Sequence, residues 1–440
     1  MSSISDWMVV AAYEWLASEN SCVISLRSEG CCIVKALAVV LGSEGDVSPF
    51  IVLGRRLAER GHKMMIAGFQ EFAARVEADG IDYIAVPGSC EQLMRRLLGD
   101  VESVADAVRG VREMLGNPGI FDALEGVMRD VDVVMYNQFG EVARLLSAAA
   151  GVPCVRVQVY PSDPCRSYSL VDPRRHDGTW RAPVIHRLSN LMMVWAMAPV
   201  MSAWRRRLGL SRRSFPRRVR TIYQFSPSLN PPDPAWGDNV YVTGEWIDDS
   251  SASERLDAQV ENFLGRGDAP LLVTFGSVVS SRLPQARTWI EEILLERKLR
   301  AIIVDPGRPS GERNGIIGVA RVPYGAVLPQ CRGMICHGSL GATGAGARAG
   351  VPCLVIAFGG DQHFHAQTVF RNGAGPDYID AQRGELTRPV LVSRIEDLVS
   401  GSYDEAAHGL AYRTADDPGV DAAVDLLLEL SFVGGGSSRA

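Results

Sequence analysis

The sequence lacks a hydrophobic run long enough to form a membrane-spanning helix. Its most apolar stretch, residues 188–203, is too short to cross a bilayer and is interrupted by Asn190 and Pro199. The first residues carry acidic side chains, Asp6 and Glu14 among them, and no basic cluster, so a secretory signal is not expected. An excess of basic residues is also missing. The formal net charge is −6, which argues against a nucleic-acid partner.

Cysteine is scarce and irregularly placed. The nine cysteines are odd in number and scattered, which is typical of reduced thiols in a cytoplasmic protein and not of a disulfide framework. Cys331 and Cys336 precede His337, yet no second group of metal ligands accompanies them, so we predict no metal site. No G-x-G-x-x-G pattern with a following acidic residue is present, which disfavours a dinucleotide-dependent oxidoreductase.

What the sequence does contain is typical of a globular protein with two domains. A chain of 440 residues is too long for one ordinary core, and its contents of 47% hydrophobic and 22% charged residues fit a globular fold. Pro231, Pro232 and Pro234 break any helix and mark a linker. We predict an extension at 1–34, a first domain at 35–230, a linker at 231–250 and a second domain at 251–440.

The second half centres on residues 333–367. An apolar strand leads into His337, small residues follow, and a helix is predicted to begin there and end near Gly350. Small residues between a strand and a helix let backbone N–H groups close on a phosphate, and the helix dipole adds to the attraction. After the next strand, Asp361 and Gln362 can hold sugar hydroxyls, because one side chain only accepts and the other both donates and accepts. The stretch predicts a site for a phosphorylated sugar; the alternative is an αβ crossover whose glycines serve packing alone.

The first half opens with a predicted β–α–β unit. Strand 35–41 runs into the loop 42–49, helix 50–60 follows, and a second strand closes the unit. Asp46 lies in the loop before the helix, where a carboxylate either caps free N–H groups or serves as a base. Polar residues also follow the later strands of this half, at the edge of the sheet where ligands bind in such folds. They are Asn137, Gln138, Gln158 and Tyr160.

Two of these stretches resemble signatures of glycosyltransferase family 1. The donor-binding signature there is commonly HHGGAGTT, then AGVP, then a DQ pair; this chain has CHGSLGAT from Cys336, AGVP from Ala349 and a later Asp-Gln pair. The loop 42–49, GSEGDVSP, resembles the GSRGDVxP opening of sterol glucosyltransferases and of the vancomycin-group glycosyltransferases. The resemblance covers about residues 35–431. It implies a GT-B fold, in which two Rossmann-like, doubly wound α/β domains face each other across a cleft.

The resemblance also implies a reaction. It is the inverting, metal-independent transfer of a hexose from a UDP- or dTDP-sugar to a hydroxyl or amine of a lipophilic small molecule, such as a natural product or sterol. The nucleotide sugar is a co-substrate and no cofactor is implied. The first domain would bind the acceptor, and the second would bind the donor and send its terminal helix back onto the first. The implied catalytic base is Asp46. The implied donor-binding residues are Ser277, Val322, His337, Gly338, Ser339, Gly341, Ala342, Thr343, Asp361 and Gln362, and the acceptor-binding residues are Gln138, Gln158 and Tyr160.

Three residues depart from the family pattern. Glu44 replaces the usual arginine of the first loop, Ala342 replaces a threonine and so removes a hydroxyl, and Ser339 replaces a glycine. These changes keep open a second hypothesis, a non-catalytic nucleotide-sugar or lipid-binding protein that kept the fold. The joint presence of Asp46, His337, Asp361 and Gln362 favours the enzyme.

Residues 163–200 are predicted to form a helical insertion with two interpretations. Its large side chains either line a lipophilic acceptor pocket or pack onto the domain core. A run of arginines between 205 and 220 is either a solvated face or a contact with anionic lipid at a membrane surface. The large side chains are Trp180, Met192, Met193, Trp195 and Met197.

Residues 1–33 show neither a signal peptide nor a consistent amphipathic pattern. We therefore expect them to be loosely ordered and outside the core. Val34 precedes the first strand, and valine codons can start translation in bacteria, so a misplaced start is one hypothesis. A genuine extension that docks on the first domain through residues such as Trp7 and Trp15 is the other.

Overall fold

The computed structural model describes residues 33–98, 104–211, 219–247, 254–276, 278, 280, 282–308 and 311–434. The chain divides into two units, Met1–Val34 and Lys35–Ala440, and the fold is that of the second unit. The expectations for residues 1–32, and for Ser277 as a donor-binding residue, lie outside the described residues.

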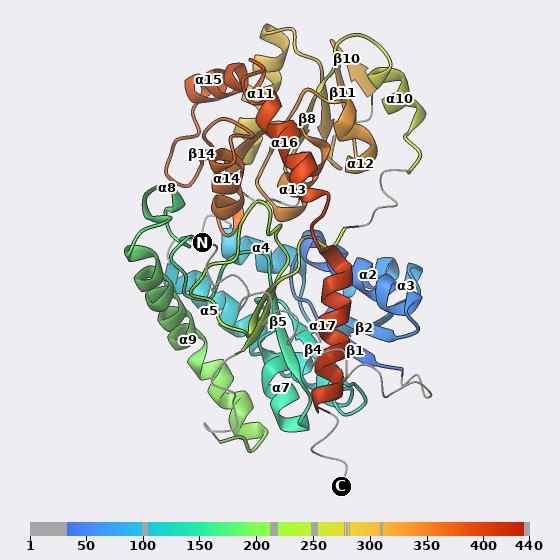
Figure 1. Cartoon of the computed structure of the whole chain (residues 1–440), viewed down its shortest axis with the longest axis vertical. Helices are drawn as coiled ribbons and strands as arrows, with labels where there is room; N and C mark the ends of the chain where they lie inside the picture. The colour runs from blue at the N-terminus through green and yellow to red at the C-terminus, as the bar shows by residue number, and fades with distance from the viewer. Residues whose placement is uncertain are drawn as a thin grey trace, which may run out of the picture. The chain divides into compact units, whose positions relative to one another are not determined.

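The first sheet has seven strands in the described residues, all parallel, in the order β3-β2-β1-β4-β5-β6-β7 (Figure 1). Its inner strands are short apolar runs; all four residues of β4 are buried, as expected for a strand covered on both faces. The strands are β1 (Lys35–Val39), β2 (Lys63–Phe69), β3 (Asp82–Val86), β4 (Val133–Tyr136), β5 (Cys154–Gln158), β6 (Arg220–Tyr223) and β7 (Val240–Val242).

The second sheet also has seven strands in the described residues, in the order β10-β11-β9-β8-β12-β13-β14. Only β10 runs antiparallel to its neighbour. Apolar clusters fill both faces of this sheet. The strands are β8 (Leu271–Thr274), β9 (Ala301–Val304), β10 (Gly311–Arg313), β11 (Ile316–Val319), β12 (Gly333–Cys336), β13 (Cys353–Ala357) and β14 (Ile379–Asp380).

Helices cover both sheets and define two lobes. The N-terminal lobe is the first sheet with α2 (Glu44–Glu59), α3 (Ala73–Ala78), α4 (Cys90–Leu98), α5 (Val104–Leu115), α6 (Pro118–Glu125), α7 (Val142–Ala150), α8 (Pro173–His176) and α9 (Arg181–Arg207). The C-terminal lobe is the second sheet with α10 (Ala258–Leu264), α11 (Leu283–Glu296), α12 (Tyr324–Val327), α13 (Leu340–Ala349), α14 (Gln362–Arg371), α15 (Arg388–Leu398) and α16 (Asp404–Thr414). The last helix is α17 (Gly419–Gly434).

The first helix begins earlier than the sequence predicts. Helix α2 starts at Glu44 and not at position 50, so Asp46 lies in its first turn rather than in a loop. Ser43 is the N-cap, and the Asp46 carboxylate accepts a hydrogen bond from the Ser43 backbone N–H at 2.7 Å. This capping box starts the helix upstream of Pro49, which lies inside the helix although proline normally marks a helix boundary.

The first sheet extends into the segment predicted to be the linker. Strand β7 lies within residues 231–250 and pairs in parallel with β6, so this part of the predicted linker belongs to the N-terminal lobe. The sequence contains a signal of this strand, because residues 241–246 (YVTGEW) resemble the VTGxW strand that ends the acceptor half in glycosyltransferase family 1. The prolines at 231–234 precede this strand rather than ending the lobe.

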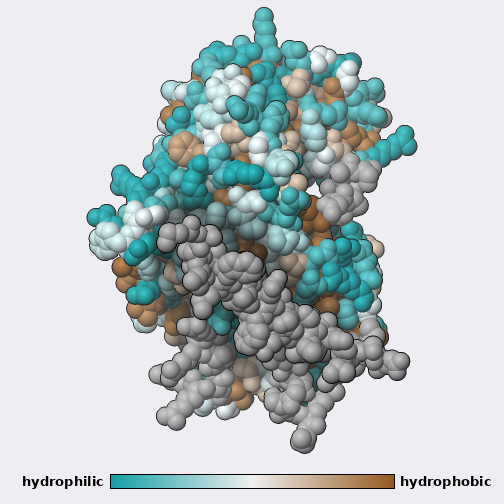
Figure 2. Space-filling view, viewed as in Figure 1, coloured by the Kyte–Doolittle hydropathy of each residue, from teal (hydrophilic) through white to brown (hydrophobic). Residues whose placement is uncertain are grey.

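Helix α9 is the most exposed apolar element that the structure describes. Most of the large side chains predicted in this region lie at the surface, with exposed fractions of 63% for Met193, 67% for Met192 and 77% for Trp195. Core packing, one of the two interpretations from the sequence, is therefore wrong for these residues. Figure 2 shows a hydrophobic patch at the lower left, where α9 lies in Figure 1. In the described segments, none of the helices combines the length and hydropathy needed to cross a bilayer.

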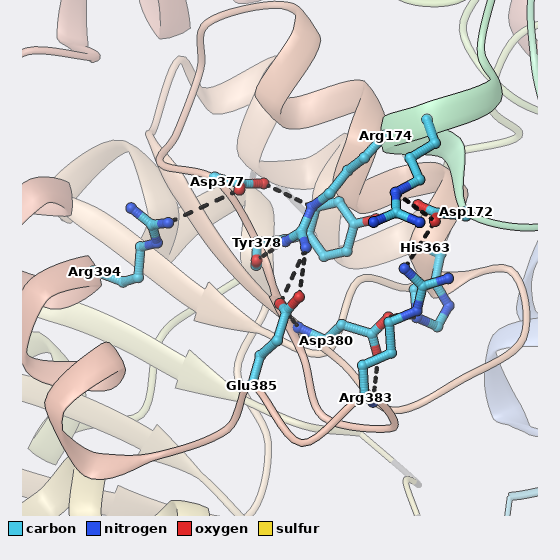
Figure 3. Close-up of polar contacts among 10 residues, drawn as sticks. Asp172, Arg174, His363, Asp377, Tyr378, Asp380, Arg383, Glu385 and Arg394 are labelled. Carbon is cyan, nitrogen blue, oxygen red and sulfur yellow. Dashed lines mark hydrogen bonds and ion pairs between the residues drawn. The ribbon is translucent and has the colours of Figure 1, made fainter.

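Several ion pairs join the two lobes, and two groups of them lie on α2 and on α8. Helix α17 lies against α2, where Arg56 makes a two-pronged contact with Asp421 at 2.7 and 2.6 Å (Figure 1). At the other place Arg174 of α8 contacts Glu385, Asp377 and the carbonyl of Tyr378 in the C-terminal lobe (Figure 3). We call this second set of contacts the Arg174 clasp.

Candidate active site between the two sheets

Each sheet has a point at which its strand order reverses, and Asp46 and His337 follow strands at these points. In the first sheet the chain winds outward from β1 on one side and from β4 on the other. Loops that follow such a pair of strands diverge and leave a crevice at the carboxyl ends of the strands. Asp46 follows β1 and Asn137 follows β4. In the second sheet the corresponding strands are β8 and β12, followed by Gly276 and His337.

One cavity of about 2180 Å³ joins the two crevices. A site for a single small ligand is usually about 300–1,000 Å³, so this cavity has room for two substrates. Gly338 and Thr343 do not line it. The predicted residues that do line it are Asp46, Gln138, Gln158, Tyr160, Val322, His337, Ser339, Gly341, Ala342, Asp361 and Gln362.

Ser43 makes hydrogen bonds to one of the two oxygens of the Asp46 carboxylate. Its Oδ2 accepts from the Ser43 backbone N–H at 2.7 Å and from the Ser43 hydroxyl at 3.0 Å. Among the described residues, its Oδ1 contacts the Asn137 side-chain amide alone, at the long distance of 3.4 Å. Burial raises the pKa of Asp46 to about 6, the Ser43 hydrogen bonds oppose that rise, and the negative charge of Asp361 adds to it. Oδ1 is therefore the oxygen available to take a proton.

Asn137 positions the loop that carries this carboxylate. Its side-chain amide donates to the carbonyl of Leu41 at 2.7 Å, and its side-chain oxygen accepts from the Leu41 backbone N–H at 3.2 Å. The residue is buried, so both bonds tie the end of β4 to the end of β1. Asn137 therefore fixes the crevice rather than offering its polar atoms to a ligand.

His337 enters the cavity as a neutral ring. Burial lowers its pKa to about 4, against smaller opposing effects from the Asp361 charge and the Thr274 carbonyl. Its Nδ1 is buried and has no hydrogen-bond partner in the part of the chain that the structure describes. A buried polar atom without a partner is costly and calls for a ligand or another explanation. This atom is the strongest indication of a ligand in the C-terminal half of the cavity.

The first turn of α13 offers fewer donors than the sequence suggests. The Thr343 backbone N–H and hydroxyl both donate to the Ser339 carbonyl, each at 3.0 Å, and Thr343 is buried away from the cavity. The Ser339 hydroxyl caps the helix by accepting from the Ala342 N–H at 3.4 Å. The N–H groups of Leu340 and Gly341 belong to the same turn and have no acceptor inside the helix. The N–H groups of this turn that remain for an anion are therefore those of Leu340 and Gly341.

Gly338 has a structural reason to be glycine. Its φ is +90°, and a β-carbon there would lie 2.6 Å from the Val355 side chain and 3.1 Å from the Gln362 carbonyl. No other residue fits this conformation and this space. The residue therefore sets the turn between β12 and α13 without lining the cavity.

Asp361 and Gln362 present different groups to the cavity. Gln362 is buried, and its side-chain oxygen accepts from the Phe358 N–H at 2.7 Å, which leaves its amide N–H groups for a ligand. Asp361 is less buried, with its Oδ2 at 3.5 Å from the Nε2 of His365. Tyr160 lies opposite on the N-terminal lobe; burial raises its pKa to about 12, and the charge of Asp361 adds to the rise. Asp361 and Gln362 thus offer a ligand one hydrogen-bond acceptor, the Asp361 carboxylate, and one donor, the Gln362 amide.

Glu245 is a site residue that escaped the sequence analysis. Glu245 follows β7 and pairs with Arg348 of α13, and its carboxylate lies so close to Gly344 that a β-carbon there would be 2.0 Å away. Gly344 in mid-helix was the available signal, because glycine there allows close approach. A methionine-rich face of α9 also lines the cavity through Met193, Met197 and Met201. The sequence offered a pocket-lining role for Met193 and Met197, but not for Met201.

Metal ligands were not predicted at this site. Across the described residues, no group of three or more His, Cys, Asp or Glu side chains is placed to hold a metal ion.

Comparison with known proteins supports the resemblance stated from the sequence. Residues 311–430 match the family described as erythromycin biosynthesis protein CIII-like, C-terminal domain. A sterol 3-beta-glucosyltransferase of Saccharomyces cerevisiae strain YJM789 is 27% identical over 370 residues. That alignment covers 77% of this chain, and the chain spans 30% of the length of the yeast protein.

Solved structures confirm the predicted fold. The glycotransferase of kitacinnamycin has a TM-score of 0.66 and 20% identity, with 90% of this chain and 99% of that chain covered. The Streptomyces sp. SF2575 glycosyltransferase SsfS6, complexed with thymidine diphosphate, has a TM-score of 0.60 and 19% identity, with 90% and 99% covered. The fold is GT-B, with two α/β domains built on parallel sheets.

Proposed function

We propose that the protein is a glycosyltransferase that moves a hexose, with inversion and without a metal, from a UDP- or dTDP-sugar to a hydroxyl or amine of a lipophilic small molecule. One observation carries the proposal. The Asp46 carboxylate, with one oxygen firmly hydrogen-bonded, and the buried His337 ring, whose Nδ1 has no partner in the described residues, follow strands at the reversal points of the two sheets and line one cavity. The similarity to a sterol glucosyltransferase and to natural-product glycosyltransferases supports the same reaction class.

Asp46 would act as the general base. With a pKa of about 6, its carboxylate is mostly ionised at neutral pH and still basic enough to take a proton. Its Oδ1 accepts the proton of the acceptor hydroxyl while that oxygen attacks the anomeric carbon. The bond from the anomeric carbon to the diphosphate oxygen breaks, and its electron pair leaves with the nucleotide diphosphate. Attack from the side opposite the leaving group inverts the anomeric centre.

The C-terminal lobe would stabilise the leaving group. The N–H groups of Leu340 and Gly341 and the positive end of the α13 dipole favour the negative charge that grows on the diphosphate. His337 Nδ1 can hydrogen-bond a phosphate oxygen once the ring is protonated, because the hydrogen bond to the Thr274 carbonyl uses the single N–H of the neutral ring. These groups supply positive potential without a metal ion.

The Asp361–Gln362 pair would hold the transferred sugar. The Asp361 carboxylate accepts from sugar hydroxyls, and the Gln362 amide donates to them because its oxygen is engaged by Phe358. Val322 lies on the segment that would run along the nucleotide base, and it lines the same half of the cavity. The thymidine diphosphate in the SsfS6 complex supports a dTDP-sugar as one of the two candidate donors.

The N-terminal half of the cavity would hold the acceptor. Met193, Met197 and Met201 of α9 give it an adaptable apolar wall, and Gln138 and Tyr160 provide polar groups near Asp46. Flexible thioether side chains suit a bulky apolar acceptor. A natural product or a sterol has this character, which agrees with the named relatives.

A non-catalytic binding protein is the second candidate. Two observations favour it: Thr343 is turned away from the phosphate position, and Glu44, in place of the family's arginine, is occupied by an ion pair with Arg75. Such a protein would bind the nucleotide sugar and leave it intact with every acceptor.

The substitution Asp46→Asn tests the proposal. Asparagine keeps the size of the side chain and can still accept from the Ser43 N–H, but it cannot take the proton. Turnover of UDP-glucose or dTDP-glucose with a panel of lipophilic alcohols should fall by ~10²–10⁴-fold. Calorimetric donor affinity should stay unchanged. Equal turnover in the variant would refute the role of Asp46, and donor binding without any transfer by the wild type would favour the second candidate.

A further inference from the structure

The exposed face of α9 is an apolar stripe without a partner in the described structure. Leu188 is 56% exposed, Leu191 65%, Met192 67% and Trp195 77%. With Val184, these residues recur at spacings of three, four and seven, so they lie on one face of the helix. None of them lines the cavity. Monomeric proteins rarely expose such a contiguous apolar patch unless it binds something.

The opposite face of the same helix forms a wall of the cavity. Asn190, Met193, Val194 and Met197 line it, and Trp204 anchors the end of the helix in the core of the lobe. One helix therefore separates the acceptor cavity from the exposed stripe. A lipophilic molecule held at the stripe is one helix diameter away from the cavity.

The charge on α9 identifies the kind of partner. The helix contains no Asp or Glu along its 27 residues, and its charged side chains are arginines. Arg181 lies seven residues before Leu188 and Arg206 eleven residues after Trp195, which places both on the face of the apolar stripe, one at each end. Both are exposed. The protein as a whole carries a net charge of −6, whereas the charged side chains on this face of α9 are positive.

We propose that the α9 stripe docks on the surface of an anionic lipid bilayer. Leucine, methionine and tryptophan side chains enter the headgroup boundary, and Arg181 and Arg206 contact lipid phosphates at the two ends of the stripe. The helix lies in the plane of the surface. A protein partner or a second copy of the chain would bury the same apolar side chains but gives no reason for an all-basic helix with an arginine at each end.

Vesicle co-sedimentation of the full chain tests this proposal without donor or acceptor, so its result does not depend on the proposed glycosyl transfer. The probes are phosphatidylcholine vesicles with and without about one quarter phosphatidylglycerol. The wild type should bind the anionic vesicles, and added salt should weaken binding. The double variant Leu191→Asp/Trp195→Asp should weaken binding by ~10-fold or more, because two charges replace apolar side chains at the interface.

Tyr412→Asp is the matched control. Tyr412 is 84% exposed and belongs to α16 in the other lobe, so its loss changes surface aromatic content but not the stripe. This variant should bind vesicles like the wild type. Binding unaffected by the double variant, or no vesicle binding by the wild type, would overturn the proposal. Sedimentation velocity is the companion measurement: a dimer that the double variant converts to monomer, with no vesicle binding, would assign the stripe to a second copy instead.

Discussion

The Asp46 carboxylate folds back over Gly42, so closely that a β-carbon at position 42 would lie 2.3 Å from Oδ2. Glycine is therefore what allows the carboxylate to reach the Ser43 N–H and turn Oδ1 toward the cavity. The absence of a side chain at Gly42, just after β1, is therefore a requirement for the proposed role of Asp46.

Substitution Gly42→Ala should displace the Asp46 carboxylate. Turnover should fall by ~10-fold or more, since a misplaced base transfers the proton poorly, while donor affinity stays the same. Gly45→Ala is the control in the same turn, because a β-carbon there would meet nothing closer than the Ser43 hydroxyl at 3.7 Å. Steady-state kinetics and donor calorimetry on both variants decide the matter. Similar losses in the two would mean that the helix start, and not the carboxylate, is the sensitive feature.

The pH dependence of the reaction should report the raised pKa of Asp46. A base must be deprotonated, so kcat/KM should fall as the pH drops through about 6. The Ser43 hydroxyl lowers this pKa by donating to Oδ2, so Ser43→Ala should move the acid limb to higher pH. Ser43→Thr keeps the hydroxyl and should leave the limb in place. If Ser43→Ala leaves the acid limb of the kcat/KM profile in place, that limb reports the ionisation of a group other than Asp46.

Donor binding should protonate His337. The buried ring has a pKa of about 4, and a phosphate oxygen at its unpartnered Nδ1 stabilises the charged form, so the bound pKa is higher than the free one. Affinity for UDP-glucose or dTDP-glucose should therefore increase as the pH falls through the bound pKa, and it should level off below the free pKa of about 4. NMR titration of the histidine ring, assigned with His337→Gln, measures the shift directly. A ring pKa that is the same with and without donor would remove His337 from the phosphate site.

Loss of the Asp361 carboxylate should weaken binding of the sugar nucleotide but not of the free nucleotide diphosphate. This carboxylate lines the cavity near Tyr160 and is proposed to contact sugar hydroxyls only. Asp361→Ala should raise the KM for the sugar nucleotide and leave the affinity for the free nucleotide diphosphate as it was. Calorimetry with both ligands checks the prediction. An equal loss for the two ligands would place Asp361 at the phosphates or in the fold instead.

Local patterns predicted most of the fold and the neighbourhood of the site. Apolar runs located β1, β4, β12 and β13, and Gly350 ends α13 where expected, with a left-handed φ of +67°. The loops after the central strands were found because parallel sheets place their carboxyl ends together. These features depend on residues close in sequence.

Features set by distant contacts were missed. The position of Glu245 depends on Arg348, 103 residues later. The inward turn of Thr343 is local, because its hydroxyl donates to the Ser339 carbonyl four residues earlier, but a helical threonine has two accessible rotamers and the sequence does not choose between them. The exposure of α9 could not be predicted because its residues are equally apolar on the cavity side and on the outer side. Periodicity identifies an apolar face but not what covers it.

The Arg174 clasp should hold the two lobes together. Arg174 donates from Nε to Asp377 at 3.0 Å and from Nη1 to Glu385 at 2.8 Å, and it lies over the Tyr378 ring at 3.8 Å from the centroid (Figure 3). These contacts are part-buried, so Arg174→Ala should cost about 1–2 kcal/mol of unfolding free energy, between the values for exposed and buried pairs. KM values for both substrates should rise, because each lobe supplies half of the cavity. Arg175→Ala is the control: its side chain is 78% exposed and pairs only within its own turn, with Asp172 at 3.6 Å. Urea unfolding and two-substrate kinetics on both variants test the clasp, and equal behaviour of the two would show that Arg174 does not hold the lobes.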